Sequence, residues 1–578
     1  MLFLYDKRMF NFLVIIFLSI ITVFWTFFIF KESMNYYFLV AVIFFRCAFS
    51  FALLRDYMAS WSKSTQKTFL RKVFINIPVF VIAVPLFYGH IRLSLLFSEF
   101  LFYLLLLNLS VYLYWYFTNG YLVEKTESVI IYGAGAAGSK IAQEFVGTKY
   151  KVCYFVDDSM SLQTRSVDGR RVLSREQLRQ KLLTDKFDML VIALPSIDNA
   201  IVKQIYKSFD EHFAQIKIMP SLENVLQDKS FMSQLKPVSL YDLLSRDTKN
   251  LDRENIESFI YGKTILVTGA GGSIGSEIVR QCVKYGAKKL VLVDHGEFNL
   301  YKLTQELPPM NVEFVMGSVL DKALLDELFC KYSIDIVFHA AAYKHVPLVE
   351  GNVSKAIENN IIGTKNTIDA AIKYGVESFI LISTDKAVRP TNVMGATKRI
   401  CELYLQNVDA KSTKLAAVRF GNVLGSSGSV IPKFEEQAKN GGPLTVTHPD
   451  ITRYFMLIPE ACELVLQAGA IAKNAEVFVL NMGEPVKIME LAKKFKRLAG
   501  RDDIEIKIIG LRPGEKLYEE LLIDENDIET DYKDIFIGRK TFYDIEILVR
   551  DIDSLMTSSN QTNLLKKIVP EFEHRLNG

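Results

Sequence analysis

The first 120 residues carry a pattern of apolar positions that the rest of the chain lacks. They contain four nearly continuous apolar runs, at roughly Phe10–Phe30, Tyr36–Leu54, Val73–Tyr88 and Leu93–Phe117. A helix needs about 20 such residues to cross a hydrocarbon layer of about 30 Å. The first, second and fourth runs reach this length, and the third is marginal. The pattern therefore predicts a transmembrane region of four helices over residues 1–120.

Basic residues flank these runs unevenly. Lys7 and Arg8 precede the first run, and five more stand between the second run and the third: Arg55, Lys63, Lys67, Arg71 and Lys72. The positive-inside rule then places the N-terminus, this central loop and everything after Phe117 in the cytoplasm. Arg46 lies inside the second run, where a lone charge is costly. It either faces a partner helix or marks a re-entrant hairpin. We expect the region to be a membrane anchor rather than a transport pathway.

From residue 128 onward, strand-like apolar runs alternate with helix-like segments, which is typical of doubly wound α/β domains. The first such unit predicts a Rossmann-like domain over 126–235, with a glycine turn between a strand and a helix. Its second strand ends about 20 residues later in an acid placed to hold an adenosine ribose. The residues of this candidate second nucleotide site are Gly133, Gly135, Gly138 and Asp157. No catalytic cluster follows, so a scaffold or regulator that has lost its ligand is an equally good interpretation.

A polar stretch over 236–262 predicts a connecting arm, partly helical, whose Leu and Tyr side chains dock on a neighbouring surface. The next unit, 263–578, opens with KTILVTGAGGSIGSEIVRQCVKYG, a strand, a glycine loop and a helix. Such a loop lets a pyrophosphate approach the helix N-terminus. Asp294 ends the following strand, 19 residues after Gly275. A carboxylate there binds ribose hydroxyls and repels a 2′-phosphate, so the pattern predicts NAD rather than NADP. The expected cofactor-binding residues are Gly269, Gly271, Gly272, Ser273, Ile274, Gly275, Asp294, Ala340 and Ala341.

Four more strands are expected in this unit, in NVEFVMGSV, DIVFHAAA, SFILIST and LAAVRFGNV. Right-handed crossovers would then give a parallel sheet of six or seven strands. Ligands of such sheets bind at the carboxyl ends of the strands. The fifth strand ends there in Thr384, Asp385 and Lys386, which indicates chemistry rather than packing. Met394 and Lys398 follow four residues apart, so they share one face of a helix. Carbonyl redox chemistry would favour Tyr at position 394.

Bulk composition adds limits. The 578 residues exceed what one core serves, and the apolar excess behind the mean hydropathy of +0.18 sits in the first 120 residues. A net charge of +3 does not favour a nucleic-acid partner. The six cysteines are scattered without a CxxC pair, which fits a reducing compartment and gives no sign of a metal site.

A family resemblance rests on seven motifs: TGAGGSIG, HAAAYKHVPLVE, NIIGT, STDKAVRPTNVMGATK, VRFGNVLGSSGSVIPKF, ITRYFM and LRPGEK. Together they resemble the extended short-chain dehydrogenase/reductases. More narrowly, they resemble the bacterial membrane-bound nucleotide-sugar 4,6-dehydratases of polysaccharide and protein-glycosylation pathways, above all those that act on UDP-N-acetylglucosamine with retention at C5. The resemblance covers almost the whole chain. It implies a multi-pass protein of the bacterial inner membrane, with cytoplasmic catalytic domains that form dimers or larger homo-oligomers.

The resemblance also implies a reaction, the loss of water from UDP-N-acetylglucosamine with one tightly held NAD⁺. Hydride leaves C4, water is eliminated across C5–C6, and hydride returns to C6 to give a 4-keto-6-deoxy sugar. Thr384 would bind the 4-hydroxyl, and Lys398 would bind the nicotinamide ribose and lower nearby pKa values. Asp385 would protonate the departing 6-hydroxyl as general acid. Lys386 would take the C5 proton if its site lowers its pKa enough to leave it neutral.

Met394 stands where the superfamily has the Tyr that acts as C4 base, a departure that the membrane-bound dehydratases share. Met cannot carry a proton. We hypothesise that Asp385, or a water held by Thr384 and Lys398, takes the proton of the C4 hydroxyl instead.

The resemblance places the sugar nucleotide in the last third of the chain. The expected substrate-binding residues are Tyr343, Asn422, Lys433, Arg453, Arg512 and Glu515. Arg suits a diphosphate because its fork binds two oxygens at once. Glu515 would hold a ribose or orient Arg512, and Tyr343 could equally be structural. The span Pro432–Gly510, with the strand EVFVLNMGE, would form a smaller substrate lobe. After Leu521 we expect packing alone.

Two alternatives stay open. A nucleotide-sugar epimerase shares the fold but generally keeps the Tyr that is missing here. A non-catalytic membrane sensor of nucleotide or redox state could use the two Rossmann-like units, although Thr384, Asp385, Lys386 and Lys398 are all present.

Overall fold

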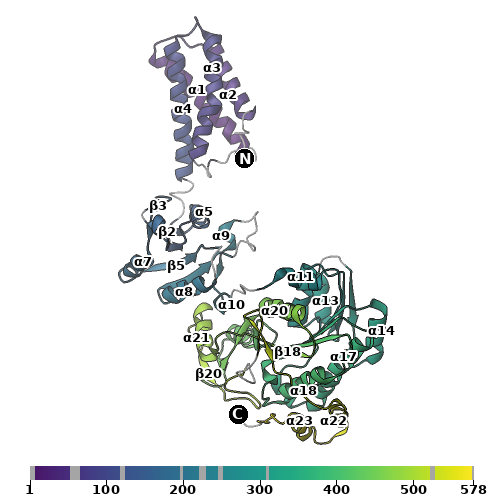
Figure 1. Cartoon of the computed structure of the whole chain (residues 1–578). Coiled ribbons are helices and arrows are strands. Elements are labelled where there is room, and N and C mark those ends of the chain that lie inside the picture. The colour runs from purple at the N-terminus through teal and green to yellow at the C-terminus, as the bar shows by residue number, and fades with distance from the viewer. Residues whose placement is uncertain are drawn as a thin grey trace. The chain divides into compact units, whose positions relative to one another are not determined.

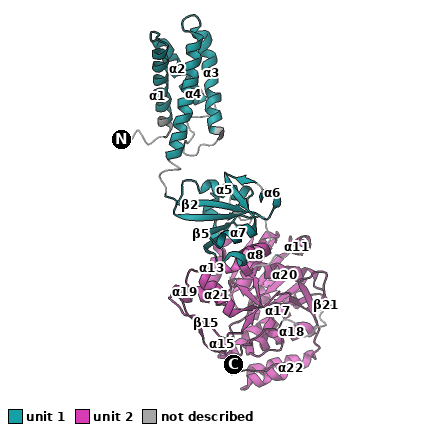
Figure 2. Cartoon of the chain, turned by 90° about the vertical axis from the view of Figure 1, so that its left-hand side faces the viewer, with its two compact units in different colours: residues 1–197, 206–237 teal, residues 198–205, 238–578 magenta. Residues whose placement is uncertain are grey.

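The chain folds, in order, into N-terminal apolar helices and two Rossmann-like α/β regions (Figure 1). The computed structural model describes residues 7–52, 61, 66–117, 124–163, 165–195, 199–220, 230–244, 251–307, 311–520 and 528–575. Two compact units result, one of residues 1–197 and 206–237 and one of residues 198–205 and 238–578 (Figure 2). The predicted fold class is thereby confirmed.

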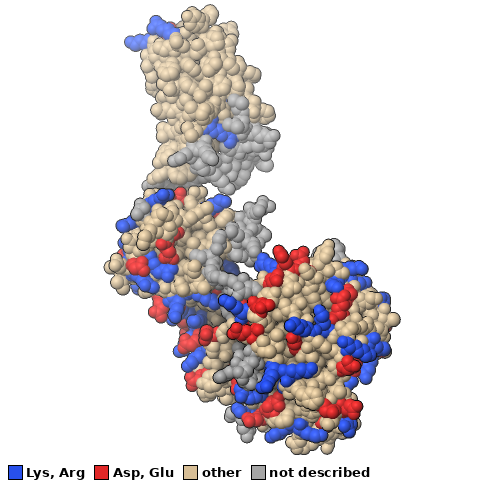
Figure 3. All heavy atoms as spheres, viewed as in Figure 1, with Lys and Arg blue, Asp and Glu red and all other residues tan. Residues whose placement is uncertain are grey.

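Four apolar helices begin the chain: α1 (Lys7–Ile29), α2 (Tyr36–Ala52), α3 (Gln66–Phe87) and α4 (Leu93–Tyr116). Three contain stretches that are long and apolar enough to cross a membrane, Asn11–Ile29, Thr68–Phe87 and Leu93–Tyr116. Figure 3 shows hardly any charged side chain on their visible surface between the two ends. The apolar exterior indicates membrane association.

The described part of α2 has 17 residues, and the last two residues of the second run, Leu53 and Leu54, lie outside the described residues. The third run is longer as a helix than predicted, because α3 begins at Gln66, ahead of the apolar run, and contains the candidate span Thr68–Phe87. Lys72 therefore belongs to a helix and not to the loop, and it is buried with its amine 5.3 Å from the centre of the Trp61 ring. Of the other basic residues expected in this loop, Arg55 and Lys63 lie outside the described residues.

Arg46 on α2 faces a partner helix, which settles the choice that its position left open. Its guanidinium forms two hydrogen bonds with the Glu99 carboxylate on α4, at 2.9 and 3.1 Å. It also donates to Ser19 Oγ at 3.2 Å and lies 3.4 Å from the centre of the Tyr103 ring. Arg46 and Glu99 are both buried. A buried pair of this kind joins α2 to α4 by charge and not only by apolar packing.

Glu99→Leu is therefore expected to destabilise the helical region by about 3–5 kcal/mol, because it leaves the Arg46 charge buried without a partner. The double variant Arg46→Leu/Glu99→Leu should recover most of this loss, since both charges are gone. Thermal unfolding of the detergent-solubilised chain measures both. Glu32→Leu is the control, because Glu32 pairs with the exposed Arg92 and should matter little. A double variant as unstable as the single one would contradict the prediction.

The first α/β region has a seven-stranded sheet in the order β3-β4-β2-β1-β5-β6-β7. The five central strands are parallel and the two edge strands are antiparallel. Its strands are β1 (Glu127–Tyr132), β2 (Tyr150–Val156), β3 (Ser166–Val167), β4 (Arg170–Leu173), β5 (Phe187–Ile192), β6 (Phe213–Ile218) and β7 (Lys236–Pro237). Its helices are α5 (Ala136–Glu144), α6 (Met160–Gln163), α7 (Arg175–Leu182), α8 (Asn199–Phe209) and α9 (Phe231–Gln234). Continuous apolar runs form β1 and β5 because helices cover a doubly wound sheet on both faces.

The residues of the predicted arm over 236–262 belong partly to the first sheet and partly to the second unit. Its first residues form β7, an edge strand of the first sheet. Its helices α10 (Leu240–Leu244) and α11 (Arg253–Ile260) pack within the second unit. The expected docking of Leu and Tyr is confirmed for Leu240, which is buried beside the partly buried Tyr241.

The second unit is organised around a nine-stranded sheet in the order β10-β9-β8-β11-β12-β13-β18-β22-β21. The first seven are parallel, as predicted, and the last two are antiparallel. The strands are β8 (Thr264–Thr268), β9 (Lys289–Asp294), β10 (Val312–Met316), β11 (Ile336–His339), β12 (Ser378–Ile382), β13 (Lys414–Arg419), β18 (Glu476–Leu480), β21 (Ile528–Glu529) and β22 (Ile535–Gly538). The order 3-2-1-4-5-6 of the first six is that of dinucleotide-binding sheets.

Helices cover both faces of this sheet and bury two apolar cores. One core includes α14 (Lys322–Tyr332), α17 (Gly363–Lys373), α18 (Val393–Asn407), α22 (Ile545–Thr557) and α23 (Gln561–Ile568). The other includes α12 (Ser273–Lys284), α13 (Glu297–Glu306) and α20 (Ile458–Ile471). Shorter segments are α15 (Val346–Glu350), α16 (Val353–Ala356), a π-helical turn at Ile357–Ile362 and a 3₁₀ turn at Asp385–Ala387.

The smaller lobe has its own apolar cluster and excludes one expected strand. It contains β14 (Asn422–Leu424), α19 (Val430–Lys439), β15 (Leu444–Val446), β16 (Thr452–Arg453), β17 (Phe455–Leu457), β19 (Val486–Lys487), α21 (Ile488–Leu498) and β20 (Ile506–Ile508). The strand in EVFVLNMGE is instead β18 of the main sheet, parallel to β13. Its apolar residues are buried because α20 crosses over and returns the chain to the sheet.

Candidate active site

Thr384, Asp385 and Lys386 lie just beyond the carboxyl end of β12. Thr384 Oγ1 donates a hydrogen bond to Asp385 Oδ1 at 2.9 Å, and Lys386 Nζ donates to the same oxygen at 3.0 Å. Asp385 is buried, and its second oxygen, Oδ2, has no hydrogen-bond partner in the part of the chain that the structure describes. A buried oxygen without a donor is costly unless a ligand supplies one. The pair is thus prepared to receive a polar group.

Lys386 does not have the neutral amine that the sequence hypothesis required. Burial by itself would lower its pKa, but the carboxylates of Asp385 and Glu519 outweigh burial and raise the pKa above its usual value. Arg453 lowers it only in part. Lys386 is therefore an ammonium group in this site, and it can accept a proton only after it has lost one.

Met394 and Lys398 share one face of α18, as their spacing predicted. Both line a cavity of about 270 Å³ together with Thr384, Lys386 and Asn422. Asn392 caps the helix, because its side chain accepts from Gly395 N at 2.8 Å. Burial lowers the pKa of Lys398. A buried amine and an apolar thioether at this place would suit a nicotinamide ribose and ring.

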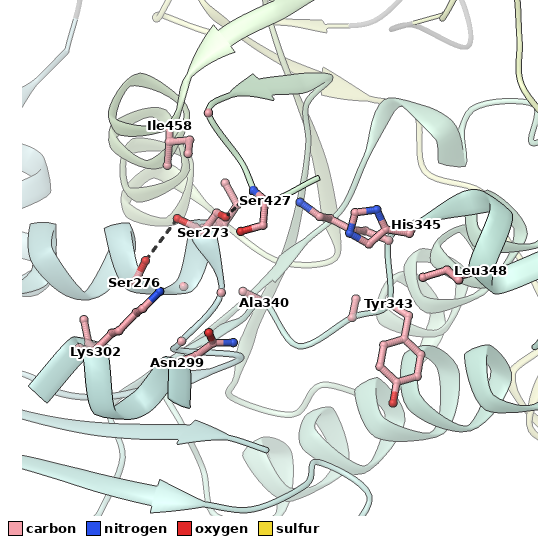
Figure 4. A pocket seen from close by; sticks show the side chains of 18 of the residues that line it. Ser273, Ser276, Asn299, Lys302, Ala340, Tyr343, His345, Leu348, Ser427 and Ile458 are labelled. Carbon is pink, nitrogen blue, oxygen red and sulfur yellow. Dashed lines mark hydrogen bonds between the residues drawn. The ribbon is translucent and has the colours of Figure 1, made fainter. Parts of the chain in front are cut away.

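The glycine loop before α12 has the geometry of a pyrophosphate-binding turn. Gly269 has a φ of +67°, and a Cβ on Gly275 would lie 2.1 Å from Gly269 O, so neither position accepts a side chain. The carboxylate of Asp294 accepts from Gly271 N at 2.9 Å. A cavity of about 860 Å³ covers the loop, where Ser427 N donates to Ser273 Oγ at 3.3 Å (Figure 4).

A smaller cavity lies beside this loop, where the adenosine ribose of a dinucleotide is expected. Asp294 lines a cavity of about 160 Å³ with Gly269, Ala340 and Ala341. Ile274 completes the first turn of α12, where the backbone N–H groups attract an anion. The predicted cofactor residues thus lie around three neighbouring cavities that Ala340 lines in common, and Lys398 lines the one that also contains Met394.

Five of the six expected substrate-binding residues meet in one cavity of about 260 Å³. It is lined by Asn422, Lys433, Arg453, Arg512 and Glu515, and also by Lys386 and Glu519. Tyr343 is not among them. It is exposed on the loop after β11 and lines the spaces around the glycine loop (Figure 4). Its ring lies edge-on to that of His295. Its backbone N donates to Asn360 Oδ1 at 2.8 Å, and Tyr343 also lines the cavity that contains Thr384 and Met394.

Glu515 contacts Arg512, one of the two roles expected for it, and it also pairs with Arg453. Glu515 accepts from the backbone N of Arg512 at 3.1 Å, and its other oxygen accepts from Arg453 Nη2 at 3.2 Å. Arg453 Nη1 donates to the carbonyls of Thr452 and Leu517. Since protein acceptors occupy much of the guanidinium, Arg453 organises the wall of the cavity, and Lys433 and Arg512 are freer to meet a diphosphate.

Glu519 is the residue that sequence reasoning missed. It is buried in the wall of the substrate cavity, with Oε1 3.5 Å from Lys386 Nζ and 3.7 Å from Arg453 Nε. It follows LRPGEK by three residues, beyond the last motif, in an ordinary Leu-Tyr-Glu-Glu-Leu-Leu run. Nothing in that run distinguishes it from Glu520.

The C-terminal segment does more than the packing expected after Leu521. Arg575 N donates to Thr391 O at 3.1 Å, and Gly514 N donates to Arg575 O at 2.6 Å. His574 Nε2 lies 2.7 Å from one oxygen of Glu350, whose other oxygen accepts from Val393 N. The segment therefore ties the start of α18 to the RPGEK loop.

The candidate second nucleotide site repeats the local geometry of the first. Asp157 Oδ2 accepts from Ala134 N at 2.9 Å, as Asp294 Oδ2 accepts from Gly271 N. A Cβ on Gly138 would lie 2.0 Å from the oxygen of Gly133, whose φ is +112°. A Cβ on Gly135 would meet nothing within 4 Å, which leaves room for a ligand. A nucleotide at this place stays a proposal.

The sheet order, the glycine loop and the cavity that Thr384 and Lys398 line together define an enzyme of the short-chain dehydrogenase/reductase class. A family model described as "Polysaccharide biosynthesis protein" matches residues 265–540, and one described as "C2185-like, N-terminal" matches residues 125–213. The chain is 42% identical over 496 residues to the capsular polysaccharide biosynthesis protein CapD of Staphylococcus aureus, covering 82% of each chain. It is 43% identical over 438 residues to the probable polysaccharide biosynthesis protein EpsC of Bacillus subtilis, covering 73% of each. The chain belongs to this polysaccharide biosynthesis family.

A more distant relative carries an enzyme name. Over 277 residues the chain is 35% identical to a UDP-glucose 4-epimerase of Rickettsia rickettsii, covering 46% of this chain and 80% of the relative. The likeness to this protein extends over less than half of the present chain.

Proposed function

We propose that this protein removes water from UDP-N-acetylglucosamine to give the UDP-linked 4-keto-6-deoxy sugar, as a step in making a bacterial glycan. The observation that carries the proposal is the Asp385–Lys386 pair, with one orphaned carboxylate oxygen, because Lys386 lines both the cavity that contains Lys398 and the cavity that contains Arg512. Elimination of water needs an acid for the leaving hydroxyl and a base for the C5 proton, and this pair supplies both.

NAD, when bound, would take hydride from C4 of the sugar and return it to C6. The glycine loop and Asp294 would hold its adenosine half, and Lys398 would hold the nicotinamide ribose. Met394 would pack against the nicotinamide ring, because its thioether is apolar. It would take no part in proton transfer, because it has no ionisable proton.

The proton path follows from the hydrogen bonds of Thr384. Its hydroxyl would accept the proton of the sugar's C4 hydroxyl while its own proton passes to Asp385 Oδ1, 2.9 Å away. Asp385 becomes a carboxylic acid, and the nearest negative charge beside Lys386 disappears. Because that charge raises the pKa of Lys386, its loss lets the ammonium release a proton to solvent.

The two side chains then complete the elimination. The neutral Lys386 amine takes the C5 proton, the C6–O bond breaks, and Asp385 gives its proton to the departing hydroxyl, which leaves as water. Lys386 returns the proton to C5 when C6 is reduced. Asp385 ends as the carboxylate, and Lys386 regains one proton from solvent, so the site is restored.

Mass spectrometry of the product tests the proposal. The detergent-solubilised full chain, incubated with UDP-N-acetylglucosamine, is expected to give a product lighter by one water. An isomer of unchanged mass would show an epimerase instead. An unchanged substrate would overturn both readings and favour a sensor.

An epimerase is the second candidate because of the UDP-glucose 4-epimerase relative. Asp385, Lys386 and Met394 favour the dehydratase, since an epimerase needs no acid for a leaving hydroxyl and generally keeps a Tyr at position 394. We further propose that the helices cross the bacterial inner membrane, that both α/β regions face the cytoplasm, and that the protein is a homo-oligomer.

A further inference from the structure

Glu519 is a buried acid that the proposed proton path does not use. Its side chain is 3% exposed, and it lines the cavity that also contains Lys386, Asn422 and Arg512. Within the described residues, no donor forms a hydrogen bond with its Oε2 oxygen. Lys386 and Arg453 balance the charge, but at 3.5 and 3.7 Å both face the other oxygen, Oε1.

The adjacent Glu520 shows that the burial of Glu519 is specific to that position. Glu520 is half-exposed and forms ordinary ion pairs, with Arg389 at 2.9 Å and with Lys516 at 3.4 Å. Burying a carboxylate with an unbonded oxygen costs free energy that the fold could avoid by turning the side chain outward. The chain turns Glu520 outward and keeps Glu519 in the cavity wall. A ligand that brings a hydrogen-bond donor to Oε2 would remove this cost.

A series of ion pairs locates Glu519 relative to the reacting groups. Along the wall, Lys386 contacts Glu519, Glu519 contacts Arg453, and Arg453 contacts Glu515, which holds the backbone of Arg512. Glu519 is therefore next to the acid–base pair, whereas Arg453 and Glu515 stand between it and the backbone of Arg512 in this series of contacts. A diphosphate would be repelled by this carboxylate, whereas a hexose carries hydroxyl and amide donors.

We infer that Glu519 binds the sugar of the substrate, with Oε2 accepting a hydrogen bond from a hydroxyl or amide N–H of the hexose. The inference rests on the proposed function only in requiring that a nucleotide sugar occupies this cavity. The contact holds the hexose beside Asp385 and Lys386, so Glu519 determines which sugars are accepted. The same contact would form in a dehydratase and in an epimerase.

Binding of UDP and of UDP-N-acetylglucosamine to the full detergent-solubilised chain, followed by calorimetry, separates a sugar contact from a structural role. Glu519→Gln keeps the size of the side chain but loses the charged acceptor. It should weaken UDP-N-acetylglucosamine binding about ten- to a hundred-fold and leave UDP binding unchanged. Glu519→Asp keeps the charge but shortens the side chain by one methylene, which moves the carboxylate away from the sugar. It should lower the affinity for UDP-N-acetylglucosamine by less than Glu519→Gln does. Glu520→Gln is the matched control and should change neither affinity.

The identity of the donor follows from UDP-glucose, which lacks the acetamido group. An equal loss for both sugar nucleotides assigns a hydroxyl, and a loss confined to UDP-N-acetylglucosamine assigns the amide. Equal weakening of UDP and the sugar nucleotides would overturn the inference, because it would show a structural role. So would unchanged binding of every ligand. The water-loss assay on the unaltered chain tests the reaction separately, so failure of one proposal is distinguishable from failure of the other.

Discussion

Asp385→Asn is expected to lower the rate of water loss by about 10²–10⁴-fold while binding of the sugar nucleotide persists, since that is the usual contribution of a general acid. Asn has the same shape and can keep the hydrogen bond from Thr384, but it cannot give a proton to a leaving hydroxyl. Rapid-quench product analysis by mass measures the rate, and calorimetry measures binding.

The same variant separates the two roles proposed for Asp385. If it also receives the C4 proton, the absorbance of reduced cofactor will not rise when substrate is added. If it is the general acid alone, reduced cofactor will accumulate because C4 oxidation proceeds and elimination stalls. Asp326→Asn, which breaks a surface pair with Lys373, is the control and should behave as the unaltered chain. An Asp385→Asn enzyme with near-normal turnover would refute the assignment.

Glu402→Gln is expected to destabilise the second unit by about 3–5 kcal/mol, because it removes the carboxylate that balances the buried Arg419, whereas Arg399 keeps its second ion pair with Glu571 at 3.0 Å. Arg419 donates to both oxygens of Glu402, at 2.6 and 2.7 Å, and Arg399 donates to one at 3.2 Å. Ser383, next to Thr384, donates to the carboxylate at 2.7 Å. Denaturant unfolding measures the loss, with Glu463→Gln as the control, because Glu463 pairs weakly with the exposed Lys284.

The effect of pH has a definite sign. Burial by itself would raise the pKa of Glu402, but Arg419 and Arg399 outweigh burial and hold the pKa below its usual value. The carboxylate therefore contributes stability above the unfolded pKa of about 4.3, and this contribution is lost as pH falls through the folded pKa. The difference in stability between the two proteins should be full near neutral pH and shrink below about pH 4. A difference that grows on acidification would contradict the argument.

Local features of the site could be predicted because they depend on backbone geometry over a few residues. Gly269 and Gly275 occupy positions that admit no side chain, and that requirement appears directly in the spacing of the glycines. Met394 and Lys398 line one cavity because four residues make about one turn of helix. The parallel order of the sheet followed in the same way from alternating apolar runs.

Other predictions failed where partners distant in sequence decide the outcome. The strand Glu476–Leu480 joined the main sheet because α20 returns the chain to β13, and no local pattern shows the length of a crossover. Tyr343 lines the spaces around the glycine loop and the cavity of Thr384 instead of the cavity that contains Arg512. The pKa of Lys386 is raised first by the adjacent Asp385 and then by Glu519, which is 133 positions further along the chain but lies 3.5 Å away.

The sequence by itself determined the kind of protein: apolar helices, two dinucleotide-type folds, and an acid and an amine at the end of the fifth strand. Periodicity, glycine spacing and motif chemistry are properties of short segments, so they can be read without a structure. Only the tertiary structure decided which of the adjacent Glu519 and Glu520 faces the substrate cavity. The two side chains are chemically identical and differ only in their tertiary contacts. Glu519 lies against Lys386 and Arg453, which come from distant parts of the chain.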